Sequence, residues 1–229
     1  MKGMLPYLLS RPDTFFSEQM KEPEDLKIPG IIVVIGGITS AVTAYLMSGV
    51  YSGLISAAVG EGMVSMMGAF SALSAFFAFL ILWWLIFAGI FYLLSMAFAG
   101  NGTFRRTLEF TGYGLVPVII GLIISTIVSL YYIPLVEVPV ITNIQDPAAV
   151  QRFMSDILMD PAFREFTWIS AVISLLFLAW SANLWIFGIR HARNLIVRNA
   201  AIVVLIPVAI FTIYTLYTTF VGMLFMGGP

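Results

Sequence analysis

The sequence predicts an all-α integral membrane protein: a bundle of five transmembrane helices with a short cytoplasmic N-terminal segment and an external amphipathic loop helix. Of the 229 residues, 60% are hydrophobic and only 10% are charged, whereas about 25% of the residues in a soluble domain are charged. The few charges leave long neutral runs between them, and the basic residues gather in alternate connections. A chain this apolar cannot cover a surface in water, so we expect its solvent to be lipid.

Five neutral runs carry the predicted spans. They are Ile28–Gly60, Gly62–Phe104, Phe110–Val136, Phe166–Ile189 and Asn199–Pro229. About 20 apolar residues cross a hydrocarbon core of about 30 Å, so each run supplies one span. We expect these spans near 31–52, 76–98, 113–133, 167–189 and 201–225.

The second run is long enough for two spans, and the distribution of positive charge decides between five and six. Five spans place nine of the 11 basic residues on one side and only Arg152 and Arg164 on the other. Six spans would divide them six against five and remove the bias expected from the positive-inside rule. We therefore predict five spans, a cytoplasmic N-terminus and an external C-terminus, with 53–75 an external loop that holds a short helix on or in the membrane surface.

Residues 1–27 form a segment apart from the membrane domain, 28–229. Its apolar residues lie beside Arg11 and Lys21, which is compatible with an interfacial helix on the inner leaflet. A mixed-charge tail packed against the bundle is the alternative.

Small residues recur every four positions in the first span, at Gly36, Ser40, Ala44 and Ser48. This spacing puts them on one helix face, where backbones can approach closely. The stripe predicts helix packing within one subunit, or else contact with a second copy in a homo-oligomer.

The loop 134–166 contains two helix starts, because Asp146-Pro147 and Asp160-Pro161 each resemble an N-cap followed by proline. Between them, apolar residues recur at helical spacing with polar residues opposite. This pattern predicts a short amphipathic helix that caps the outer helix ends or takes part in recognition.

The chemistry missing from the sequence is informative. There is no cysteine, one histidine and a net charge of −1, which excludes thiol catalysis, a multi-histidine metal site and general attraction to nucleic acid. No ionisable residue is expected deep in a span, and the mid-span amide Asn183 is assigned either to contact another helix or to line a small-molecule pocket. We therefore expect neither an enzyme nor a cofactor.

Five arginines are predicted to emerge on one face: Arg105, Arg106, Arg190, Arg193 and Arg198. Each cation can gain about 1 kcal/mol from anionic lipid, so together they suit a lipid headgroup or an acidic partner. As topology anchors they would need no ligand. Glu109 lies four residues after Arg105 and is expected to pair with it.

The stretch Ala99-Gly100-Asn101-Gly102-Thr103-Phe104-Arg105-Arg106, running into Gly112-Tyr113-Gly114-Leu115-Val116-Pro117, resembles the junction between the second and third spans of the Yip1 domain family. Residues 185–207 resemble its junction between the fourth and fifth spans, and the early Arg11-Pro12 and Phe15-Phe16 resemble the leader of its prokaryotic members. The eukaryotic relatives act in vesicle traffic with Rab GTPases and carry Asp-Leu-Tyr-Gly-Pro in a longer tail. This chain lacks that segment, so GTPase coupling is not carried over.

The resemblance implies a non-enzymatic protein of the cell membrane with an organising or trafficking-like role, acting through membrane lipids or other membrane proteins. A channel or carrier for an uncharged or lipidic solute is the alternative.

Overall fold

The computed structural model describes residues 4–141 and 143–225, and residues 1–3, 142 and 226–229 lie outside the described part. Helices and short turns make up its regular structure. In chain order they are α1 (Met4–Ser10), α2 (Pro12–Gln19), α3 (Lys27–Val50), α4 (Ser52–Val59), the 3₁₀ turn η1 (Glu61–Met63), α5 (Val64–Ala78), the π-helical η2 (Phe79–Ile86), α6 (Phe87–Met96), α7 (Phe104–Gly114), α8 (Val116–Tyr132), the 3₁₀ turn η3 (Ile133–Leu135), α9 (Pro147–Met159), α10 (Pro161–Ala192) and α11 (Val197–Phe225).

Five helical segments of the described residues are long and apolar enough to cross a membrane, which confirms the predicted five-span fold. They cover Lys27–Val50, Val64–Met96, Phe104–Leu135, Pro161–Ala192 and Val197–Thr219. The second segment is one long rod of α5, η2 and α6, and no sixth span is found among the described residues.

The predicted ends of three spans were wrong. The second segment begins at Val64 and absorbs much of the predicted loop 53–75, of which α4 is the separate helical part. The third and fourth begin at Phe104 and Pro161, because the side chains of Thr103 and Asp160 accept hydrogen bonds from backbone N–H groups of the first turn. Apolarity alone had placed both starts later.

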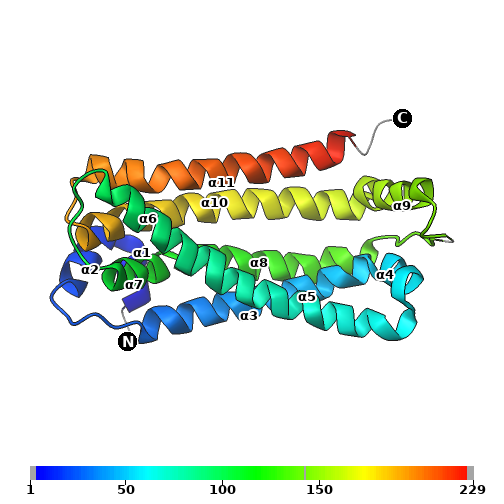
Figure 1. Cartoon of the computed structure of the whole chain (residues 1–229), viewed down its shortest axis with the longest axis horizontal. Helices are drawn as coiled ribbons and strands as arrows, with labels where there is room; N and C mark the ends of the chain where they lie inside the picture. The colour runs from blue at the N-terminus through cyan, green and yellow to red at the C-terminus, as the bar shows by residue number, and fades with distance from the viewer. Residues whose placement is uncertain (1–3, 142, 226–229) are drawn as a thin grey trace.

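The long segments alternate in direction, so the two ends of the bundle differ (Figure 1). One end, named here the basic end, holds α1, α2, α7 and the connections 97–103 and 193–196. The other, the acidic end, holds α4 and α9, and α11 ends on that side.

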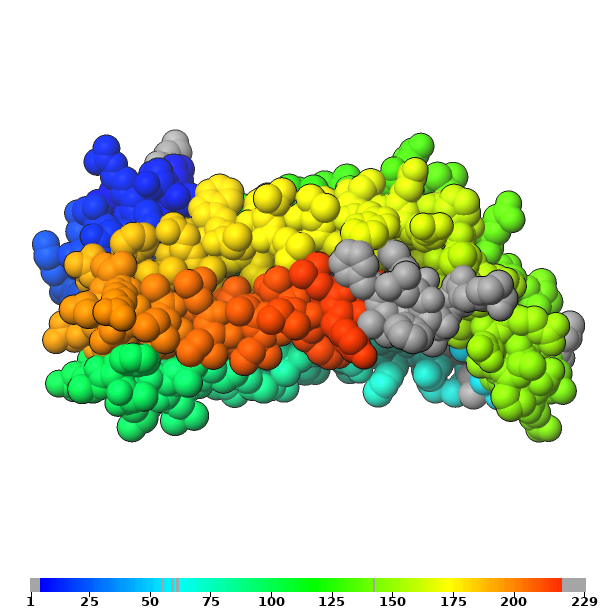
Figure 2. All heavy atoms as spheres, turned by 90° about the horizontal axis from the view of Figure 1, so that it is seen from above, coloured from blue at the N-terminus to red at the C-terminus, as the bar shows by residue number. Residues whose placement is uncertain are grey.

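The N-terminal helices α1 and α2 pack on the bundle. Leu8 and Phe16 are completely buried, and the ring of Phe16 lies 4.8 Å from that of Phe110 on α7. Phe15 meets Tyr113 edge to face at 5.3 Å. Figure 2 shows the segment lying over one end of α10, along which α11 runs side by side. The described part of residues 1–27 therefore forms ordered helices packed on the bundle, and its position on the inner leaflet stays a prediction.

Small residues mark the places where helices meet. A Cβ atom on Gly36 would lie 2.3 Å from the ring of Phe79, and one on Gly121 would lie 2.8 Å from Phe177. Gly36 is buried, whereas Ser40, Ala44 and Ser48 are half-buried along the same helix. Gly36 therefore packs against other helices of the same chain, while contact of the stripe with a second copy stays a prediction.

The predicted amphipathic helix of the acidic end is present as α9. Asp146 caps it by accepting a hydrogen bond from the N–H of Ala148 at 3.0 Å. Phe153 and Ile157 are buried on its inner side, in a cluster with Val50 and Phe163. The helix thus covers the ends of α3 and α10, as expected of a structural cap.

Candidate functional site at the basic end

The core of the basic end is an ion pair inside the protein. Arg106 lies in the first turn of α7, and its Nη1 is 2.8 Å from Oε2 of Glu109, one turn further on. The side chains of Arg106 and Glu109 are 8% and 0% exposed. A buried charge must be paired and hydrogen-bonded to be tolerated, so these two residues depend on each other.

The same guanidinium group fastens the N-terminal segment. Arg106 donates from Nη1 to the carbonyl of Gln19 at 3.3 Å and from Nη2 to the carbonyl of Glu22 at 2.6 Å. The hydroxyl of Thr103, which caps α7, donates a hydrogen bond to Glu24. The start of α7 therefore holds the chain that leads from α2 into the first span.

A second contact joins α2 to the end of α10. Oδ1 of Asp13 lies 2.6 Å from Nη1 of Arg190 and 2.7 Å from Nε2 of His191. The hydrogen bond with His191, with the charge of Arg190 beside it, holds the pKa of Asp13 below its usual range. Residues almost the whole length of the chain apart are thereby joined at the basic end.

Arg193 fastens the connection between α6 and α7. It is 2% exposed and donates to the hydroxyl of Ser95 at 2.8 Å, to the carbonyl of Gly100 at 2.7 Å and to the carbonyl of Gly102. Its guanidinium carbon also lies 4.2 Å from the centre of the Tyr92 ring, a cation–π contact. Gly102 itself has φ +143°, a conformation that favours glycine.

A polar pocket of about 600 Å³ opens between these contacts. Its lining residues come from three stretches of the chain: Met20, Glu24, Asn101, Gly102, Thr103, Arg106, Arg190, His191, Ala192, Asn194 and Leu195. In the contacts described, Arg190 uses only Nη1, which leaves its other donors for a ligand. Guanidinium donors of this kind suit a phosphate or carboxylate oxygen.

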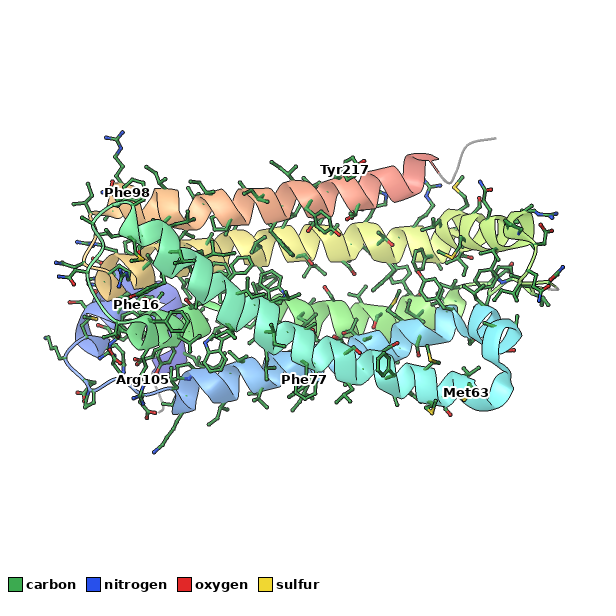
Figure 3. The ribbon with its side chains drawn as sticks, viewed as in Figure 1. Phe16, Met63, Phe77, Phe98, Arg105 and Tyr217 are labelled. Carbon is green, nitrogen blue, oxygen red and sulfur yellow. The ribbon has the colours of Figure 1, made fainter. Side chains whose placement is uncertain are left out.

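The structure brings all five predicted arginines to the basic end but gives them different surroundings. Arg105 and Arg198 are exposed, and Arg190 is partly exposed beside the pocket; Figure 3 shows Arg105 at the same end as Phe16 and far from Met63. Arg106 and Arg193 point inward and are bonded within the protein, so they cannot form part of an outer basic surface. Glu109 pairs with Arg106, not with Arg105 as expected, because Arg106 lies on the buried side of α7.

The structure also locates Asn183 and the glycines that were named from the sequence. Asn183 is exposed on α10 between the buried Ala182 and Leu184, and it neither contacts another helix through a hydrogen bond nor lines one of the pockets described here. The expected contact of Asn183 with another helix or a small molecule stays a prediction. Gly112 and Gly114 lie in α7, where Gly114 leaves room for Trp185.

Sequence reasoning missed several partners. Trp84 and Trp185 donate to the carbonyls of Leu108 and Thr111 at 2.8 and 3.0 Å, and so hold α7 just before it turns into α8. No spacing rule connects them, since the partners are backbone atoms on another helix. The sequence did offer a signal for Asp13, because an acidic residue just after Arg11-Pro12 is able to stabilise the start of α2 or to form an ion pair with a distant cation.

These features define a multi-pass helical membrane protein whose connections at one end are fastened by buried and half-buried charges. The Yip1 domain model matches residues 7–219, so the chain belongs to the Yip1 domain family, and the match takes in most of the N-terminal segment. The chain is also similar to an uncharacterized protein of Methanocaldococcus jannaschii, with 34% identity over 123 residues, which are 54% of this chain and 86% of that relative. No solved structure matches it.

Proposed function

We propose that this protein is a non-enzymatic organiser of the cell membrane that binds anionic lipid headgroups at its basic end, which faces the cytoplasm. The observation that carries the proposal is the meeting of Arg105, Arg190 and Arg198 on one end, where Arg190 also lines a polar pocket of about 600 Å³. The three residues come from three different helices, α7, α10 and α11, so only the folded bundle places them together.

The charges at the two ends support the orientation. The acidic end holds six of the 12 acidic residues but only Arg152 and Arg164 of the 11 basic ones. Positive residues concentrate on the cytoplasmic side of membrane proteins. The N-terminus is then cytoplasmic and the C-terminus external.

The buried bonds give the basic end a fixed shape. Arg106 and Arg193 hold the neighbouring connections from inside, while Arg105 and Arg198 remain outside. An exposed cation near an anionic leaflet gains about 1 kcal/mol, and a preformed set of cations loses less entropy on binding. Of the three buried charged side chains in the described part, Arg106 and Arg193 are bonded to several protein groups and Glu109 is bonded to Arg106 through Oε2, which supports a structural role for them over a catalytic one.

The test is lipid selectivity in bilayer nanodiscs with mixed anionic and zwitterionic phospholipids. Arg105→Gln combined with Arg198→Gln should lose most of the preference for the anionic lipid, as measured by native mass spectrometry of the released complexes. Arg152→Gln combined with Arg164→Gln removes the same charge from the acidic end and should leave the preference unchanged.

Two outcomes would contradict the proposal. Unchanged selectivity in correctly oriented Arg105/Arg198 variants would reduce these arginines to topology anchors. Loss of a co-purified acidic protein, with unchanged lipid selectivity, would make the basic end a protein-binding surface.

A carrier for an uncharged or lipidic solute is a second proposal, favoured by an apolar cavity of about 170 Å³ within the bundle. Because the chain has no cysteine, Thr212→Cys and Ser174→Cys each introduce a single thiol at the cavity wall. A water-filled path would let a membrane-impermeant thiol reagent label both positions. Protection of both from the reagent would exclude such a path.

A further inference from the structure

The cavity inside the bundle lies at the middle depth of the membrane-spanning segments. Trp83, Gly121 and Leu178 line it, and each is near the centre of its span. Ser40 of the first span and Thr212 of the last complete the ring of contributing helices. The hydrocarbon centre of a bilayer is therefore the medium next to this cavity.

The surroundings of the cavity are apolar and accessible to lipid. The cavity is partly open to the outside, and Ser174 on its wall is exposed. On the outer faces of α10 and α11 at this depth, Leu176, Ile210 and Ile213 are 65%, 64% and 66% exposed. Large apolar side chains exposed in a membrane span face lipid chains, so the cavity opens toward hydrocarbon.

The shape of the second span helps to form the cavity. Phe79 and Trp83 line it from η2, an eight-residue π-helical segment. π-Helical turns are rare and are frequently found at functional sites. The ring of Trp83 contacts the ring of Phe211 on α11, with the ring centres 4.8 Å apart. This contact forms the wall of the cavity at which the second and last spans approach each other.

The volume sets the size of the occupant. An apolar cavity of about 150 Å³ stays dry and accepts a molecule the size of benzene, so about 170 Å³ has room for roughly six carbon atoms. That matches the last part of a lipid chain and is too small for a whole lipid. Leaving such a volume empty would forfeit the dispersion contacts of its lining.

We infer that this cavity binds the end of the hydrocarbon chain of a bilayer lipid, which inserts between α11 and the η2–α8 side of the bundle. The chain end completes the packing between the last span and the rest of the protein. The inference does not depend on the function proposed for the basic end, since the two sites lie at different depths.

Tryptophan quenching by brominated lipid tests the inference, because Trp83 lies on the cavity wall. The protein is reconstituted in phosphatidylcholine vesicles with bromine near the chain end, bromine near the carboxyl end, or no bromine. The contribution of Trp83 is the emission lost in Trp83→Phe. Distal bromine should quench this contribution strongly, and proximal bromine should quench it much less.

Variants that fill the cavity distinguish quenching by a lipid chain inserted in the cavity from quenching by the lipid around the protein. Thr212→Phe and Ser40→Leu fill it from opposite walls and should each remove most of the distal quenching of Trp83. Ile213→Phe adds similar bulk to the exposed face of α11 and should leave the quenching unchanged. Size-exclusion chromatography checks that each variant elutes as a single folded species. Because the two filling substitutions lie on different helices, the test does not depend on either variant alone.

Three results would overturn the inference. Trp83 emission that no brominated lipid quenches would show that no chain reaches the cavity. Equal quenching in the filled variants would show that Trp83 senses only the surrounding lipid. Quenching by 1-bromohexane added to unbrominated vesicles, without quenching by distally brominated lipid, would assign the cavity to a small apolar solute.

Discussion

Arg106 and Glu109 form an ion pair of 2.8 Å on one side of α7, and neither side chain is more than 8% exposed. The pair is local in sequence but its consequences are not, because the same guanidinium group holds the carbonyls of Gln19 and Glu22. The stability of the basic end should therefore depend on Arg106 and Glu109, although neither residue is proposed to contact a lipid headgroup.

Breaking this pair should be costly. Arg106→Met leaves the Glu109 carboxylate buried without its partner, and removing one member of a buried pair costs about 3–5 kcal/mol. The midpoint of denaturation in mixed detergent micelles measures the loss. Arg105→Met, on the exposed neighbour, should change the midpoint little, and equal effects of the two variants would contradict the structure.

The hydrogen bonds donated by the guanidinium group of Arg193 should contribute more to stability than its positive charge. Arg193→Lys keeps the charge but cannot reach the carbonyls of Gly100 and Gly102 together with Ser95, and each buried group left unsatisfied costs about 1–3 kcal/mol. We expect a lower melting temperature and faster proteolysis within residues 97–103. Arg198→Lys is the matched control, and the same sensitivity there would argue against the inward contacts.

Two glycines of α3 provide a test of helix packing. Gly36→Leu drives a side chain into Phe79 and should destabilise the protein by about 1–3 kcal/mol. Gly49 has open space around its missing Cβ, so Gly49→Leu should be tolerated. Thermal unfolding in detergent measures both, and equal tolerance would show that the small-residue face is not a packing surface.

Orientation can be measured with single cysteines, because the chain has none of its own. Asn101 and Gln151 are both exposed, at the basic and acidic ends respectively. On intact cells an impermeant maleimide should label Gln151→Cys and should label Asn101→Cys only after permeabilisation. The reverse pattern would place the basic end outside.

The Asp13 contact should contribute at neutral pH and vanish in acid. The pKa of Asp13 is lowered in the folded protein from its ordinary value of 3.8, so its ionised form stabilises the fold above that pH, and the contribution is lost as pH falls through the folded value. Since Asp13 is half exposed, Asp13→Asn should cost only about 1 kcal/mol or less. Melting temperatures of wild type and Asp13→Asn should differ at pH values above 3.8 and converge only at lower pH, as pH falls through the lowered pKa of the folded state. A difference that persists in acid would rule out an electrostatic origin.

Hydropathy and the distribution of positive charge together predicted the number of spans, because lipid imposes a minimum apolar length on each one and the basic residues excluded a sixth. It did not predict where the helices begin, since Thr103 and Asp160 start them through side-chain hydrogen bonds before the apolar residues do. The continuous run from Val64 likewise contains no residue that ends a helix, so the rod extends beyond the membrane-sized portion that was expected.

The arginines show the limit of charge patterns. Their sequence positions place them at one end, but whether each points inward depends on helix rotation and on backbone carbonyls. Arg193 is buried by the carbonyls of Gly100 and Gly102, and Arg190 meets Asp13 across most of the chain. These relationships arise only when the segments are assembled in three dimensions.

The docking of α2 has a consequence for biosynthesis. Residues 4–26 leave the ribosome before the five spans, yet Phe16 packs on Phe110 and Asp13 bonds to Arg190 and His191. The segment cannot complete its contacts until the fourth span has been made and inserted. A segment synthesised ahead of every span is therefore secured late, and intermediates truncated before α10 would leave Asp13 without its partners.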